Sequence, residues 1–122
     1  MDKIPFNRKE FLRAVEAGIK NEYMKYDLHG AYLGGADLGG ADLRGADLRG
    51  ADLDFASLPL WCGSLRIKAD KRIAAQIAYH FCSLECDDKD FIMARNAIID
   101  FANQFYRVRE CGELEHLPQE AE

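Results

Sequence analysis

Leucine recurs every five residues, seven times in succession, in the first half of this chain. The residues are Leu28, Leu33, Leu38, Leu43, Leu48, Leu53 and Leu58. A period of five matches neither the helical period of about 3.6 residues nor the strand period of about two. The segment therefore cannot form one long regular element with a single buried face.

The residues around these leucines repeat as well. Alanine stands two places before each of the last six leucines, and aspartate directly precedes five of the seven. Glycine follows two places after five of them, where it would cost roughly 1 kcal/mol in a helix interior. We expect a chain that turns a corner every five residues, with leucine and alanine inward, aspartate outward and glycine at the corner. The seven leucines would form its core.

The unit Ala-Asp-Leu followed by two variable residues resembles the pentapeptide-repeat family over about residues 27–58. This resemblance implies a right-handed, four-sided β-helix with four pentapeptides per coil, so that Leu28 lies under Leu48, Leu33 under Leu53 and Leu38 under Leu58. The seven repeats would make fewer than two coils, about 10 Å tall at ~4.8 Å between stacked strands. A spiral this short needs end caps, which the flanking segments would supply.

The expected fold is mainly a β solenoid with helical caps, in a single domain of 122 residues. Residues 1–26 would form an N-terminal helical cap and residues 27–60 the β-helix. Residues 61–111 would form a C-terminal α-helical hairpin, and residues 112–122 a flexible tail.

The N-terminal cap begins with a helix start signal. Asn7 followed by Glu10 is typical of a capping box, and Phe6 with Phe11 has the spacing of a hydrophobic staple. These residues predict a helix over about residues 8–20, whose apolar stripe would cover the first coil. The stripe comprises Phe11, Leu12, Val15 and Ile19.

Two helices are predicted after the repeats. The first begins near Asp70, and its apolar face comprises Ile73, Ile77, Phe81 and Leu84. The second begins at a break at Asp87 and Asp88 and continues to about Arg109. Because its apolar residues cover more than one face, we expect these C-terminal helices to form a homodimer.

The charge pattern offers the main candidate surface. The chain has 16 Lys+Arg against 21 Asp+Glu, a net charge of -5, which disfavours direct nucleic-acid binding and membrane-surface binding. Six Asp and two Arg give residues 27–60 a local charge of -4. The candidate interaction surface comprises Asp37, Asp42, Arg44, Asp47, Arg49, Asp52 and Asp54.

Two interpretations of these outward residues stay open. In the first, the aspartates are a solvated row that hydrogen-bonds corner backbone groups, and the module binds an unknown protein partner. The second follows from the resemblance, because some relatives carry an acidic β-helix that mimics duplex DNA and inhibits a type II topoisomerase. The small predicted height and the two arginines disfavour this second interpretation.

The remaining residues offer no catalytic arrangement. His29, His80 and His116 lie in different predicted elements, and the glycines follow the five-residue period rather than a phosphate-loop pattern. Cys82 and Cys86 are spaced to share a metal, but no second pair completes a ligand set. We expect no enzyme activity, no cofactor, no metal and mostly buried, reduced thiols. Without a signal peptide or a membrane-spanning run, the expected location is cytoplasmic.

Overall fold

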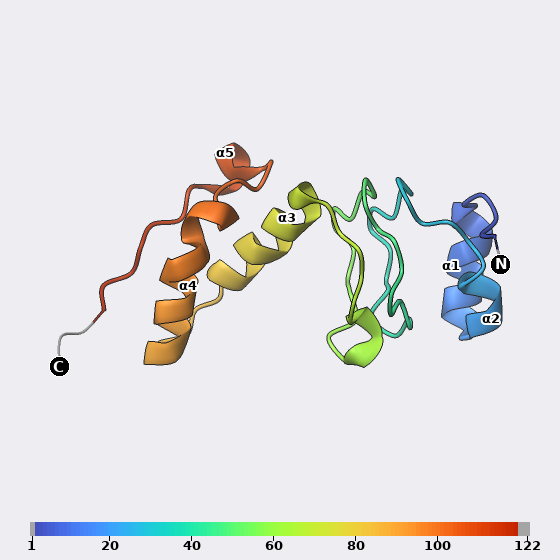
Figure 1. The fold of residues 1–122 in the computed structure, drawn as a ribbon, viewed down its shortest axis with the longest axis horizontal. Helices are drawn as coiled ribbons and strands as arrows, with labels where there is room; N and C mark the ends of the chain where they lie inside the picture. The colour runs from blue at the N-terminus through green and yellow to red at the C-terminus, as the bar shows by residue number, and fades with distance from the viewer. Residues whose placement is uncertain (1, 120–122) are drawn as a thin grey trace. The chain divides into compact units, whose positions relative to one another are not determined.

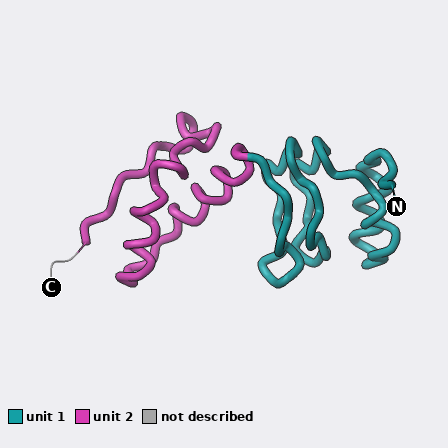
Figure 2. Tube along the Cα trace, in the orientation of Figure 1, with its two compact units in different colours: residues 1–70 teal, residues 71–122 magenta. Residues whose placement is uncertain are grey.

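The computed structural model describes residues 2–119 of the chain. The chain divides into two compact units, residues 1–70 and residues 71–122 (Figure 2). The repeats lie in the first unit after two short helices, and the second unit is helical (Figure 1). The single domain expected from the sequence stays a prediction.

The first unit begins with helix α1, Arg8–Ala17. The Asn7 side chain accepts a hydrogen bond from the Glu10 amide at 3.0 Å, and the Phe6 and Phe11 ring centroids lie 5.5 Å apart. These contacts confirm the predicted cap residue and the hydrophobic staple.

Helix α1 is shorter than expected. It ends at Ala17 because Gly18 adopts a left-handed conformation with φ 73°. A second helix, α2, follows over Lys20–Tyr23, so the predicted N-terminal cap contains two short helices rather than one. The predicted apolar stripe is therefore broken, and Ile19 is 50% exposed.

The repeats form a coil whose backbone returns beside itself after about 20 residues. The amides of Leu33 and Leu38 donate to the carbonyls of Asp52 and Ser57, at 2.9 and 3.1 Å. Parallel bridges join Tyr32 to Asp52 and Asp37 to Ser57. This register is the one that stacks Leu33 beneath Leu53, as predicted.

Each five-residue step ends in a tight turn. The amide of Ala31 donates to the carbonyl of Leu28 at 3.1 Å, and five later alanines repeat this bond with the leucines three places before them. At the corner of that first turn Gly30 has φ 70°, as the third residue of a type II turn requires. Between such turns only a short stretch is free to pair, and the described residues show isolated bridges rather than named strands. The mainly β prediction is thus met only in part, whereas helices do flank the repeats.

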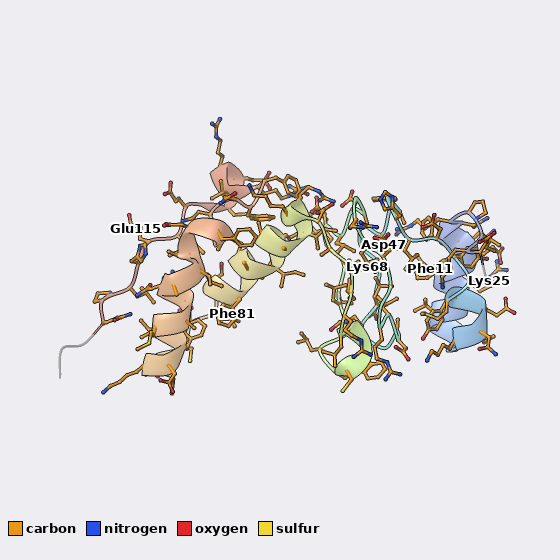
Figure 3. All side chains as sticks on the ribbon, in the orientation of Figure 1. Phe11, Lys25, Asp47, Lys68, Phe81 and Glu115 are labelled. Atoms are coloured by element: carbon orange, nitrogen blue, oxygen red, sulfur yellow. The ribbon has the colours of Figure 1, made fainter. Side chains whose placement is uncertain are left out.

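The coil continues beyond residue 60, where the sequence pattern ends. The amides of Leu43 and Leu48 donate to the carbonyls of Gly63 and Lys68, at 2.7 and 2.9 Å. Asp47 forms a parallel bridge with Lys68, and Figure 3 labels both side chains. A short 3₁₀-helix, η1 over Cys62–Ser64, lies in this last part of the coil. The coil therefore includes about ten residues that lack the repeat motif.

The second unit contains α3 over Lys71–Cys82, α4 over Lys89–Ala102 and α5 over Val108–Cys111. Helices α3 and α4 pack against each other, which confirms the predicted pair of helices. Asp88 caps α4, because its side chain accepts the amides of Asp90 and Phe91.

The core of this unit differs from the predicted apolar face of α3. It comprises Tyr79, Cys82, Ala102 and Phe105, with the Tyr79 and Phe105 ring centroids 4.9 Å apart. Of the predicted face, Ile73 is buried as expected, at 1% exposed, whereas Ile77 and Leu84 are 50% and 58% exposed. The prediction was wrong for these two residues because the residues of α3 that meet Phe105 and Ala102 lie on a neighbouring face of the helix.

The predicted third helix also needs correction, whereas the flexibility of the tail stays a prediction. Helix α4 ends at Ala102 rather than near Arg109, and α5 is a separate turn of helix. Residues 112–119, expected to be flexible, are held along α4 by side-chain hydrogen bonds such as that from Asn103 to the Leu114 carbonyl. The predicted tail residues 120–122 lie outside the described residues.

Candidate interaction surface

The aspartates that precede the repeat leucines cap the corners of the coil. In each case one carboxylate oxygen accepts the backbone amide two residues later, at 3.0 to 3.2 Å. The pairs are Asp27–His29, Asp37–Gly39, Asp42–Arg44, Asp47–Arg49 and Asp52–Asp54. This Asx-turn bond offers the corner a partner that alanine could not supply. The aspartate row is thus part of the local folding pattern.

Asp42 differs from the other aspartates because it is buried. Its residue is 6% exposed, and its carboxylate contacts Arg44 at 2.7 Å and Lys20 at 2.5 Å. Its backbone amide donates to the Tyr23 hydroxyl at 2.9 Å. Asp42 therefore joins α2 to the repeats, and the Arg44 and Lys20 side chains hold its pKa far below the usual range.

We expect replacement of Asp42 by asparagine to reduce the acid sensitivity of the first unit. The lowered pKa stabilises the fold above the unfolded-state pKa of about 3.9, and protonation removes this stabilisation as the pH falls. Asparagine keeps an oxygen for the Asx turn but loses the ion pairs. Asp42→Asn should lower the urea midpoint of unfolding at pH 7. Below about pH 4 the midpoint of this variant should fall less steeply with pH than that of the wild type. Urea denaturation followed by Trp61 fluorescence measures both.

The matched control for this prediction is Asp47→Asn. Asp47 pairs with Arg49 at 2.8 Å in the same geometry, but its side chain is 30% exposed. Its substitution should have a smaller effect. Equal acid dependence of the wild type and Asp42→Asn would contradict the role of this carboxylate.

The other candidate surface residues are distributed around the coil. Arg44 and Arg49 are half-exposed, and each pairs with the aspartate two residues before it. Asp37 is exposed and accepts the Ser57 hydroxyl at 2.9 Å, which lowers its pKa. Asp52 and Asp54 are partly buried. The seven candidates therefore do not form one free acidic patch, and several of their charges are already compensated.

The predicted inward leucines lie in the core with one exception. Leu28, Leu33, Leu38, Leu43, Leu48 and Leu53 are at most 6% exposed, whereas Leu58 is only partly buried. The next residue, Pro59, is fully buried instead. Trp61, two residues further on, is 47% exposed, and its Nε1 donates to the Gly39 carbonyl at 2.9 Å.

Large apolar side chains continue the five-residue series of the corner glycines, although the left-handed residue at the last corner is Arg66, with φ 60°. Phe55, Leu60 and Leu65 stand at the five-residue spacing that glycine holds up to Gly50, and they are 90%, 100% and 50% exposed. Phe55 also has φ 63°, a conformation that costs a bulky residue about 1 to 2 kcal/mol. The replacement of the corner glycines was the sequence signal for this feature.

One side of the coil combines these apolar corners with a groove. We call this side the Asp37 face and define it by Asp37, Phe55, Ser57, Leu60 and Trp61. Asp37 and Ser57 lie on neighbouring coils in the middle of the side, between the corners at Phe55 and Leu60. A groove of about 510 Å³ lies beside Asp37, and its walls come from α1 and the first coil.

Helix α1 forms the outer wall of this groove. Leu12 and Val15 line it, so these predicted stripe residues do not seal the coil completely. Arg8 fixes the helix to the first coil, because its guanidinium donates to the carbonyls of Tyr32 and Gly34 at 3.0 and 2.8 Å. The same guanidinium lies 4.7 Å from the centre of the Tyr32 ring.

A metal site and a membrane-spanning helix each place requirements on the described residues. Among residues 2–119, no three His, Cys, Asp or Glu side chains gather in a way that could hold a metal ion. The four cysteines form no disulfide, and only Cys82 is buried, contrary to the expectation of mostly buried thiols. Over the same residues, every helix is too short or too polar to cross a bilayer.

Residues 27–59 match the family model described as pentapeptide repeats, with eight copies. This segment is a pentapeptide-repeat array. The match confirms the resemblance stated from the Ala-Asp-Leu motif and adds one copy to the seven counted from leucine. No significant match is found to a curated protein or to a solved structure. The flanking helices lie outside the matched residues.

Proposed function

We propose that the chain is a non-enzymatic pentapeptide-repeat protein that binds another protein through its Asp37 face. The observation that carries this proposal is Phe55, a phenylalanine that is 90% exposed in a left-handed conformation. The Phe55 side chain gains little from burial, and its backbone adopts a conformation that favours glycine. Exposed aromatic and apolar side chains are typical of residues that dominate binding energy once a partner covers them.

We further propose that the array has the right-handed quadrilateral β-helix geometry that its family implies. The register of about 20 residues supports this geometry, because four five-residue steps then complete one coil. On such a coil Phe55 and Leu60 stand at adjacent corners. They would contact one partner together, across the small Ser57 side chain between them.

DNA mimicry is the alternative, and the geometry favours it less. A mimic needs carboxylates free to take the place of phosphates. Here Arg44 and Arg49 neutralise Asp42 and Asp47. The apolar corners at Phe55 and Leu60 have no counterpart on a phosphate backbone.

Replacement of Phe55 by glycine tests whether this residue serves the fold or a partner. We expect Phe55→Gly to leave the first unit as stable as before, or to stabilise it by about 1 kcal/mol, because glycine adopts this conformation freely. Phe55→Ala removes the ring but keeps the strained conformation, so it should be less stable than Phe55→Gly. Urea denaturation followed by Trp61 fluorescence measures both. A loss above about 1 kcal/mol in Phe55→Gly would make Phe55 a packing residue instead.

We also propose that the protein forms a homodimer through its C-terminal helices. Exposed apolar side chains on α3 and α4 support this proposal: Ile77, Phe81 and Met93 are 50%, 37% and 60% exposed. Sedimentation at tens of micromolar should give twice the chain mass of 13.8 kDa, and Phe81→Ser combined with Ile77→Ser should give the monomer. A monomeric wild type at that concentration excludes the dimer.

A further inference from the structure

The segment after α5 lies along α4 and is held there by two asparagines. Asn103 donates from Nδ2 to the Leu114 carbonyl at 2.8 Å and accepts the Leu114 amide at 2.9 Å. Asn96 forms the same pair of bonds with Leu117, at 2.8 and 2.9 Å. Figure 1 shows this extended segment running beside α4. Each asparagine thus binds the backbone of one leucine through both of its polar groups.

The spacing of these contacts fits an extended peptide of one particular conformation. Asn96 and Asn103 are seven residues apart, about 10.5 Å along a helix and nearly on one face. Leu114 and Leu117 are three residues apart, about 9.3 Å in a polyproline II conformation, which brings every third backbone group to the same side. Pro118 favours this conformation at Leu117. The segment runs antiparallel to the helix.

Arg95 completes the set of backbone contacts. This residue is 5% exposed, and its Nη1 donates to the Glu115 carbonyl at 2.8 Å and to the Asn96 side chain at 3.2 Å. Its Nε donates to the Cys82 carbonyl at 2.8 Å. Because a buried guanidinium that loses an acceptor is costly, any occupant of this groove must offer a carbonyl at the same place.

The segment fills the apolar part of the groove incompletely. Leu114 packs against the core cluster around Tyr79 and Phe105, but Leu117 is 38% exposed. Both leucines border an open cavity of about 800 Å³, which Cys82 at the end of α3, the loop before α4 and Arg95 also line. A larger apolar side chain at the Leu117 position would therefore bury more area.

We propose that Arg95, Asn96 and Asn103 form a peptide-binding groove, which residues 112–119 occupy until a partner displaces them. The partner would be an extended peptide of another protein, with leucine at one position and leucine or a larger apolar residue three places later. The polar contacts of the groove are all to backbone groups, so they accept any peptide of this pattern. This groove lies in the second unit and is separate from the Asp37 face.

A labelled peptide with the sequence Gly-Glu-Leu-Glu-His-Leu-Pro-Gln, that of residues 112–119, tests this proposal against the full chain by fluorescence anisotropy. The wild type should bind it weakly, because the attached segment competes at an effective concentration in the millimolar range. Leu114→Asp with Leu117→Asp opens the groove and should bind at least about tenfold more tightly. Adding Asn96→Ala and Asn103→Ala should remove this gain. A peptide with phenylalanine in place of the second leucine should bind more tightly than the parent.

Helical circular dichroism shows whether the opened variant is folded. If it is not, hydrogen exchange of the wild type supplies the test, because saturating peptide should speed exchange of the Leu114 and Leu117 amides. The proposal is overturned if the folded, opened variant does not bind, or if the asparagine substitutions leave binding unchanged. It is also overturned if saturating peptide leaves the hydrogen exchange rates of the wild-type Leu114 and Leu117 amides unchanged. A dimer that Asn96→Ala and Asn103→Ala dissociate would assign the groove to a second copy instead.

Discussion

Replacement of Leu43 by alanine should destabilise the first unit by about 2 to 5 kcal/mol. Leu43 is fully buried, and its amide donates to Gly63 on the next coil at 2.7 Å. Its core is only about two coils tall, so no neighbouring layer can move far enough to fill the cavity. Urea denaturation followed by the fluorescence of Trp61, the single tryptophan, reports on this unit.

The matched control is Leu60→Ala, the same substitution at a corner residue that is 100% exposed. Its effect should stay within about 0.5 kcal/mol. Similar losses in the two variants would mean that leucine position on the coil does not determine stability.

Replacement of Gly63 by alanine should cost about 1 to 3 kcal/mol. A Cβ at this position would lie 2.6 Å from the Ala41 carbonyl oxygen and 2.5 Å from the Trp61 ring. The ring can move, but the carbonyl belongs to the backbone of the neighbouring coil. The substitution therefore strains the contact between coils and should shift the Trp61 emission together with the urea midpoint.

Gly40→Ala is the control for this prediction. Gly40 does not have a positive φ, and nothing lies within 4 Å of the position a Cβ would take. Its stability should change by less than about 0.5 kcal/mol, because alanine reduces the entropy of the unfolded chain without a clash. If Gly63→Ala were as stable as Gly40→Ala, the coil would not extend through residue 63 as described.

The repeats could be predicted from the sequence because each five-residue unit determines its own turn. Aspartate caps the corner, glycine adopts the positive φ seen at Gly30, and the leucine side chain points inward. One motif therefore defines the turn, the buried face and the register. This local agreement is why the predicted stacking of Leu33 and Leu53 holds. The last part of the coil could not be predicted because Gly63 and Lys68 join it through their backbone carbonyls. Every residue has a backbone carbonyl, so such bonds leave no motif in the sequence.

The second unit was harder to predict because its contacts depend on partners that are distant in sequence. Helix periodicity identified α3 but could not choose between the face with Ile77 and the face with Tyr79. That choice depends on Phe105, more than 20 residues later in the chain. Asn96 and Asn103 looked like ordinary polar helix residues because their partners are backbone groups of an extended segment.

Of the residues that define the Asp37 face, only Asp37 was among the candidates predicted from the sequence. The acidic row was the conspicuous pattern, whereas in the structure its carboxylates cap turns and pair with arginines. Phe55 and Leu60 were overlooked because their exposure depends on which side of a corner they stand. An interruption of the glycine period is the pattern that indicates such residues.

The most direct test of this account compares an apolar variant with an acidic variant in quantitative affinity capture from extracts of the native cells. One variant carries Phe55→Gly and Leu60→Ser. The other carries Asp37→Asn and Asp52→Asn, which keeps the Asx turns but removes two charges. We predict that the apolar variant captures at least about tenfold less partner protein than the wild type. The acidic variant should capture an amount within about twofold of the wild-type amount. Retained capture by the apolar variant and lost capture by the acidic variant would contradict the account and favour DNA mimicry.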